Sequence, residues 1–131
     1  MKITVLEGDI TEVSVDAIVN GGTLDLGDLD TTFTSLSGTG GSVALGGATL
    51  TLDDTSDSSA YAGDITGSGG LVKRGASTQV LSGANTYTGT TTIFGGTLEL
   101  DFAAAGGPVD NIISDLSTLT MAGGSLLVTG A

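Results

Sequence analysis

Residues 67–100 read GSGGLVKRGASTQVLSGANTYTGTTTIFGGTLEL, and this stretch decides the predicted fold. It contains three short apolar or β-branched runs, at residues 71–72, 79–81 and 90–94. Gly, Ser, Asn and Thr residues bound the runs and are typical of turns. Strands this short are not stable alone, because each needs hydrogen-bonded neighbours. The rest of the chain must therefore supply neighbouring strands.

The end of this stretch, a Gly-Gly pair followed by alternating aliphatic residues, recurs along the chain. Full copies begin at Gly21, Gly40, Gly46, Gly95 and Gly123, and a degenerate copy begins at Gly69. Successive starts are 19, 6, 23, 26 and 28 residues apart. A period of about 20–30 residues without helical patterning indicates stacked coils rather than a sandwich. The Gly pair predicts a tight corner in each coil, where a side chain would clash or φ must be positive.

We therefore expect an all-β protein, a parallel β-helix (β-solenoid) of about four to five coils that is almost free of helix. Alternate residues after each corner should point inward, because side chains in a strand alternate between its two faces. The residues expected in the core are Leu24, Leu26, Leu50, Leu52, Leu98, Leu100, Leu126 and Val128. Tyr87, Phe94 and Phe102 are also expected to pack inside.

Residues 67–100 resemble the passenger-associated strand repeat of bacterial autotransporters, a unit of right-handed parallel β-helices. Gly67–Leu81 is similar to the first half of that repeat, and Ser82–Gly89 to its middle. Weaker similarity covers Gly21–Ala62 and Leu98–Ala131. The resemblance implies a stalk at the cell surface or outside the cell. It also implies a full-length parent that carries a membrane barrel in the outer membrane.

Residues 1–20, MKITVLEGDITEVSVDAIVN, differ from the repeats at 21–131. They predict a strand at Ile3–Leu6, a turn at Asp9–Glu12 and a second strand at Ala17–Val19. This order resembles the start of a macro domain, a family that binds ADP-ribose. The resemblance implies that Asp9, followed by Ile10, contacts the adenine.

The macro-domain resemblance stops at residue 20, where the Gly-Gly pair at 21–22 begins and the phosphate loops are missing. The alternative is a strand-turn-strand cap over the exposed first coil of the solenoid, whose edge would otherwise be unpaired. A chimeric or designed origin would explain the junction. The sequence thus divides into a cap, residues 1–20, and β-helix repeats, residues 21–131.

The charge excludes several function classes. Fifteen acidic residues against three basic ones give a net charge of −12 over 131 residues, which disfavours nucleic acid and anionic lipid as partners. No apolar run approaches the ~18 residues of a membrane span, so no membrane insertion by this segment is expected. No signal peptide follows Met1. The absence of Cys excludes disulfides and fits a chain that crosses an envelope unfolded.

Two acidic clusters are candidate sites, Asp25–Asp30 and Asp53–Asp57. The first lacks the Gly and Asp spacing of a calcium-binding repeat, because Leu24 and Leu26 stand at those positions. The second resembles the paired carboxylates of pectin-degrading β-helices, but the chain has no His and few bases to move a proton. The sequence therefore predicts solvated acidic turns, with no catalytic residue, metal or cofactor. Lys73 and Arg74 are expected to face solvent.

The leading functional hypothesis is a structural stalk segment with no chemistry of its own, and not an enzyme. The alternative is a binding module, for glycan along a solenoid face or for ADP-ribose through Asp9 and Ile10. Residues 101–116 break the strand pattern around Pro108 and predict one short helical or bulging turn. The edge of the last coil is expected to stay open, which predicts end-to-end self-association that grows with salt.

Overall fold

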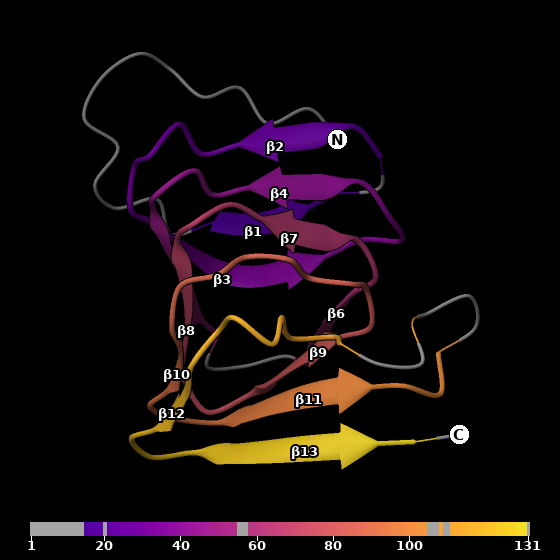
Figure 1. The fold of residues 1–131 in the computed structure, drawn as a ribbon. Coiled ribbons are helices and arrows are strands. Elements are labelled where there is room, and N and C mark those ends of the chain that lie inside the picture. The colour runs from indigo at the N-terminus through magenta and orange to yellow at the C-terminus, as the bar shows by residue number, and fades with distance from the viewer. Residues whose placement is uncertain (1–14, 20, 55–57, 105–107, 109–110, 131) are drawn as a thin grey trace.

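The computed structural model describes residues 15–19, 21–54, 58–104, 108 and 111–130, with the side chains of 15–18 excepted. Figure 1 shows strands wound into a stack, with the N-terminal strands at the top and β13 at the bottom. The described strands are β1 (Val15–Ile18), β2 (Thr23–Asp25), β3 (Thr31–Ser37), β4 (Ser42–Ala44), β5 (Thr49–Asp53), β6 (Ser59–Tyr61), β7 (Asp64–Thr66), β8 (Gly70–Arg74), β9 (Thr78–Leu81), β10 (Thr91–Ile93), β11 (Thr97–Asp101), β12 (Leu119–Met121) and β13 (Ser125–Thr129).

The strands form three parallel sheets, and the chain returns repeatedly to the first of them. The orders are β1-β3-β5-β8-β10-β12 in the first sheet, β13-β11-β9-β6 in the second and β2-β4-β7 in the third. The predicted β-solenoid is thereby confirmed. None of the described residues is helical, so this part of the chain contains no helix that could cross a membrane.

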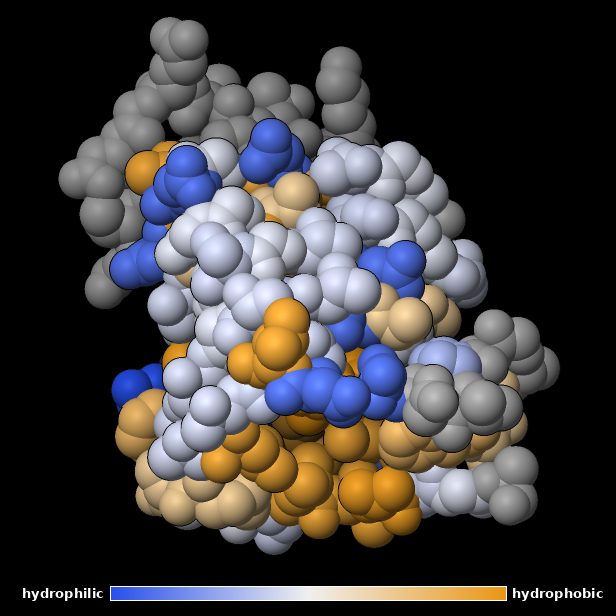
Figure 2. Space-filling view, viewed as in Figure 1, coloured by the Kyte–Doolittle hydropathy of each residue, from blue (hydrophilic) through white to orange (hydrophobic). Residues whose placement is uncertain are grey.

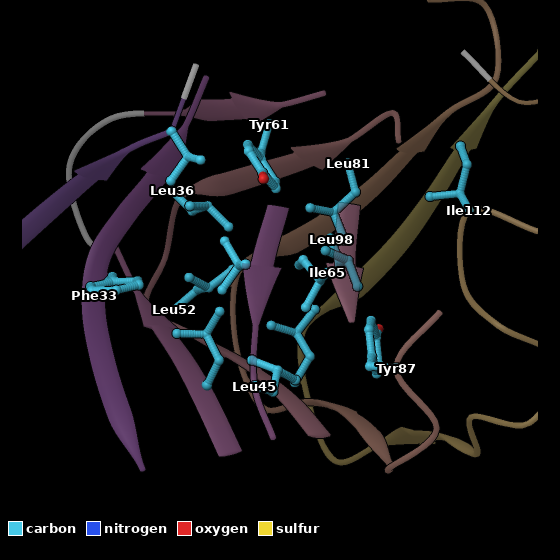
Figure 3. Close-up of a cluster of buried hydrophobic side chains, with 14 of the residues drawn as sticks. Phe33, Leu36, Leu45, Leu52, Tyr61, Ile65, Leu81, Tyr87, Leu98 and Ile112 are labelled. Carbon is cyan, nitrogen blue, oxygen red and sulfur yellow. The ribbon is translucent and has the colours of Figure 1, made fainter. Parts of the chain in front are cut away.

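The register of the first sheet explains how the coils share one interior. Leu50 pairs with Leu71, and Leu71 pairs with Thr91, so equivalent residues lie 20 or 21 positions apart. Alternation along each strand then stacks inward residues on inward residues. In Figure 3, Leu52, Ile65 and Leu98 extend into one shared core from the first, third and second sheets, respectively. All three side chains are completely buried.

The predicted glycine corners are present. The second glycine of four pairs has a positive φ: Gly22 at 69°, Gly41 at 78°, Gly96 at 60° and Gly124 at 62°. L-amino acids with a side chain rarely adopt this conformation, so the pair sets the direction in which each coil enters its next strand. Gly69 is needed for a different reason. A Cβ there would lie 1.8 Å from the carbonyl oxygen of Ala48 in the preceding coil.

The predicted core is confirmed in part. Leu26, Leu50, Leu52, Leu98 and Leu100 are buried, whereas Leu24 and Leu126 are half-buried and pack against the core. Val128 was expected to be buried, but 56% of its surface is exposed. It pairs with Leu100 on one side, and no described strand lies on its other side. Among the described strands, Val128 is therefore covered from one side.

The three aromatic predictions have different outcomes. Tyr87 is completely buried, and Phe102 is half-buried against the core. Phe94 is 44% exposed, so its predicted burial is wrong. It follows the inward-pointing Ile93 and therefore points outward, where its ring lies 4.5 Å from the guanidinium carbon of Arg74. This contact is a cation–π interaction on the surface.

The long segment between β11 and β12, residues 102–118, lengthens the last coil. Thr91 pairs with Leu119, which is 28 residues further along the chain. Of the helical or bulging turn predicted here, the described residues 111–118 show bends and a turn without helix, and Ile112 within them is completely buried. The described part of this segment thus covers the interior with Ile112 and adds no strand of its own.

The described part of the N-terminal segment joins the solenoid. β1 pairs in parallel with β3, and the Val19 N–H donates to the carbonyl of Ser37 over 2.8 Å. The predicted strand at Ile3–Leu6 and the turn at Asp9–Glu12 lie outside the described residues. The division of the chain at residue 20 stays a prediction.

The two buried tyrosines provide a matched test of the core. The Tyr87 hydroxyl lies 2.6 Å from Thr91 Oγ1, whereas the Tyr61 hydroxyl has no hydrogen-bond partner among the described residues. Burial raises the pKa of each hydroxyl to about 12. We expect Tyr87→Phe to lower the free energy of unfolding by about 1 kcal/mol and Tyr61→Phe to leave it unchanged or raise it. Urea unfolding of both variants is the measurement, and equal losses would contradict the assignment.

Candidate functional site

The described residues of the first acidic cluster hold the backbone of the coils. Asp25 Oδ1 accepts a hydrogen bond from Gly27 N over 2.9 Å, within its own turn. Asp28 and Asp30 accept hydrogen bonds from Gly47 N and Thr49 N of the next coil, over 2.6 and 2.8 Å. The carboxylates remain exposed, as expected, but they also link one corner to the next.

The second acidic cluster separates into different environments. Asp53 is exposed on β5, and Asp57 lies outside the described residues. Asp54 is only 6% exposed, so the prediction of a solvated turn is wrong at this position. Its carboxylate accepts a hydrogen bond from Ser59 Oγ, and its carbonyl accepts one from Ser77 Oγ. Within the described ranges, no group of three or more acidic side chains is placed to hold a metal ion.

Lys73 contradicts the expectation that it faces solvent, because its side chain is completely buried. It occupies an inward position of β8, between Leu52 on β5 and Ile93 on β10. Its Nζ donates to the carbonyls of Arg74 and Gly75 at the corner that follows. A Cβ at Gly96 would lie 2.9 Å from Nζ, so the corner glycine of the next coil leaves room for the amine.

The environment of Lys73 lowers the pKa of its amine. Burial lowers the pKa of Lys73, and the charges of Asp54 and Asp53 oppose that shift in part. A buried amine with a lowered pKa is a candidate nucleophile or base in an enzyme. Here its hydrogen bonds go to backbone carbonyls and hold a corner of the coil.

Gln79 is a buried polar residue whose role the sequence analysis missed. Its Nε2 donates to the carbonyl of Leu36 over 2.8 Å, and its Oε1 accepts from the Leu36 N–H over 3.3 Å. The side-chain amide thus pairs with both backbone groups of a residue 43 positions earlier. A buried peptide group without such partners would destabilise the fold. The Gln79 side chain thus makes the two hydrogen bonds to Leu36 that the backbone of a neighbouring strand would make.

Asn85 connects three coils in the same manner. Its Oδ1 accepts a hydrogen bond from Ile65 N over 2.8 Å, and its Nδ2 donates to the carbonyl of Ile112 over 2.7 Å. The residue is buried and lies where the chain passes the third sheet without forming a strand. The sequence pattern marked Asn only as one of the residue types that bound the strands and gave no partner for Asn85.

Buried hydroxyl groups complete the polar interior near Tyr87. Thr91 Oγ1 lies 2.8 Å from Ser117 Oγ, which donates to the carbonyl of Gly89 over 2.7 Å. Because each hydroxyl has one hydrogen, the chain of donors runs from Tyr87 through Thr91 and Ser117 to the Gly89 carbonyl. These groups bond to each other and to the backbone, as Lys73, Gln79 and Asn85 do.

The outward side of the first sheet carries a regular column of side chains. The paired positions are Thr32, Thr51, Val72, Thr92 and Thr120. Threonine suits such a surface because its branched side chain packs well on a pleated sheet. Asp9 and Ile10, the residues implied for ADP-ribose, lie outside the described residues, so that hypothesis stays a prediction.

The fold and the interior define a parallel β-solenoid whose buried polar groups support the backbone. Residues 71–100 match the family model described as Passenger-associated-transport-repeat, so this part of the chain is similar to that repeat. The match covers β8 to most of β11, the stretch whose sequence suggested the fold. The predicted autotransporter resemblance is confirmed.

Two curated relatives extend the similarity beyond that repeat. The chain is 58% identical over 114 residues to the adhesin BmaC autotransporter of Brucella suis biovar 1 (strain 1330), covering 87% of this chain and 3% of the relative. It is 41% identical over 93 residues to the autotransporter lipoprotein NalP of Neisseria meningitidis serogroup B (strain MC58), covering 70% of this chain and 8% of the relative. The chain therefore spans a small part of each. No solved structure matches it.

The buried amine gives a test of the interior that depends on pH. The pKa of Lys73 is lowered in the folded state from its ordinary value of 10.5. At a pH between these two pKa values, the folded chain therefore binds fewer protons than the unfolded chain. The free energy of unfolding of the natural chain should therefore rise with pH in that window. Lys73→Met should lose this slope. Urea unfolding of both proteins from pH 7 to pH 10 is the measurement, and identical slopes would contradict a buried Lys73.

Proposed function

We propose that this chain is a structural stalk segment of an autotransporter passenger, displayed on the cell surface or secreted, with no chemistry of its own. The observation that carries the proposal is the use of its polar groups. Lys73, Gln79 and Asn85 bond to backbone groups inside the coils, and Asp28 and Asp30 bond to the next coil. The side chains best suited to chemistry hold the stack together.

The composition supports export of such a segment. The chain has no Cys that could form a disulfide before it crosses an envelope. Each coil adds about 4.8 Å along the stack, so repeated coils extend a stalk at a fixed rate per coil. The relatives are autotransporters by name, and a parent of this chain would carry a membrane barrel for export. Adhesion by the whole parent is a further proposal, because the relative named as an adhesin is far longer.

Neighbouring residues on β5 separate a structural role from a binding role. Thr51 points outward in the threonine column, whereas Leu52 is completely buried. Leu52→Ala should lower the free energy of unfolding by about 2–5 kcal/mol. When the chain is placed in a tagged passenger on bacteria, the same substitution should reduce the amount of tag that remains on the cell surface after protease treatment. Thr51→Ala should change stability by less than about 0.5 kcal/mol and leave display unchanged.

Substitutions in the threonine column test the alternative of glycan binding on a solenoid face. That hypothesis stays a prediction of the sequence. If Thr51→Ala with Thr92→Ala kept stability and display but abolished attachment of the bacteria to a glycan surface, the segment would be a binding module. Unchanged attachment is the outcome expected of a stalk.

A further inference from the structure

We propose that the corner after β8 is a binding site for a primary ammonium group, which the natural chain fills with the amine of its own Lys73. The site, here named the ammonium site, consists of three backbone carbonyl groups and a glycine: Arg74, Gly75, Ser77 and Gly96. When the Lys73 side chain is removed, the same groups should bind a free alkylammonium ion. The proposal concerns the interior of the coils and does not depend on the function as a stalk.

Carbonyl oxygens gather around the amine. The Nζ of Lys73 donates to the carbonyl of Arg74 and, over 3.4 Å, to that of Gly75. A Cβ at Gly96 would lie 2.9 Å from Nζ, 2.5 Å from the Gly75 oxygen and 2.3 Å from the Ser77 oxygen, so these three atoms border the same small space. An ammonium group has three N–H donors and no acceptor, which suits a space bordered by acceptors. Because Gly96 has no side chain, this space stays free for the amine.

The charged residues that act on the site favour a cation over a neutral group. Burial disfavours the charged amine of Lys73, whereas the carboxylates of Asp54 and Asp53 favour it. Asp54 is itself buried and lies at the preceding corner, where its carbonyl oxygen would be 2.1 Å from a Cβ at Gly75. Hydrogen bonds from a charged donor are stronger than those from a neutral donor. The corner therefore offers a cation both acceptors and compensating charge.

The stem of the lysine occupies the aliphatic core and defines the second half of the ligand. Lys73 is completely buried, and the register places it between Leu52 and Ile93, which are also completely buried. Lys73→Ala would leave an apolar space next to the carbonyl groups. Apolar cavities in protein cores stay dry and bind small apolar molecules. Propylammonium replaces the atoms that this substitution removes, with an alkyl chain inside and an amine at the corner.

Other small cations lack one of these two features. Potassium ions bind to rings of backbone carbonyl oxygens, but a potassium ion would leave the apolar space empty. Tetramethylammonium has the charge and the apolar surface, but it has no N–H group that could donate to the carbonyls. The site should therefore prefer propylammonium to both.

The acidic surface of the chain also attracts cations without any specific site. The net charge is −12, and hydrophilic residues lie at several places on the face seen in Figure 2. Screening of surface charges depends on ionic strength and not on the shape of the ion. Potassium and tetramethylammonium chloride at the ionic strength of the propylammonium chloride are therefore matched controls.

Urea unfolding of Lys73→Ala at pH 7 in each of these three salts tests the proposal. Propylammonium should lower the unfolding equilibrium constant by a factor of 1 + [L]/Kd relative to the controls, which is about two when its concentration equals Kd. The matched variant is Leu71→Ala, because Leu71 is also completely buried on β8 but is apolar. It should respond equally to the three salts. Equal responses of Lys73→Ala to the three salts, or an equal propylammonium effect on both variants, would overturn the proposal.

Nuclear magnetic resonance of the natural side chain decides the proposal if Lys73→Ala does not fold. Lys2→Arg leaves Lys73 as the only lysine of the chain. Isotope-labelled lysine should then give amine protons that exchange slowly with water and show a nuclear Overhauser effect to the α protons of Gly96, because Nζ lies beside that residue. Rapidly exchanging amine protons without this contact would contradict the ammonium site.

Discussion

Parallel hydrogen bonding between successive coils is the constraint on which the rest of the structure depends. Short strands, most of three to five residues, have few contacts of their own, so each is stable only between neighbours. The pairing must also keep inward residues above inward residues, since a shift of one position would turn the core outward. The glycine corners at 22, 41, 96 and 124 serve this register, because they turn the chain into the next strand.

The polar interior follows from the same constraint. Wherever a coil departs from a regular strand, backbone groups are left without a ladder partner, and a buried peptide group must still be paired. Gln79 supplies both partners to Leu36, and Asn85 joins Ile65 to Ile112 across three coils. The amine of Lys73 bonds to carbonyls at a corner. These side chains substitute for backbone, which explains polar groups in a core that is otherwise aliphatic and aromatic.

The sequence predicted the features that repeat and missed those that depend on distant partners. The Gly-Gly period and the burial of Leu50, Leu52 and Leu98 follow from local alternation, and the structure confirms them. The prediction that Lys73 faces solvent followed from its charge alone. Lys73 lies two residues after the inward-pointing Leu71 on the same strand, and this spacing indicates an inward side chain. The partner of Gln79 lies 43 residues away and leaves no local signal. The exposure of Val128 depends on whether a further coil covers it, which its own pattern does not encode.

Distances along the outward threonine column test the stacking of coils most directly. Spin labels at Thr32 and Thr92 lie three strand spacings apart, and labels at Thr51 and Thr92 lie two apart. Moving one label by 19 residues should therefore shorten the backbone separation from about 14 Å to about 10 Å. Labelled chains are diluted into unlabelled chains, so that only the two labels within one chain interact. Electron paramagnetic resonance should then report a shorter distance between the labels at Thr51 and Thr92 than between those at Thr32 and Thr92. A separation that stayed the same or grew would contradict the parallel solenoid.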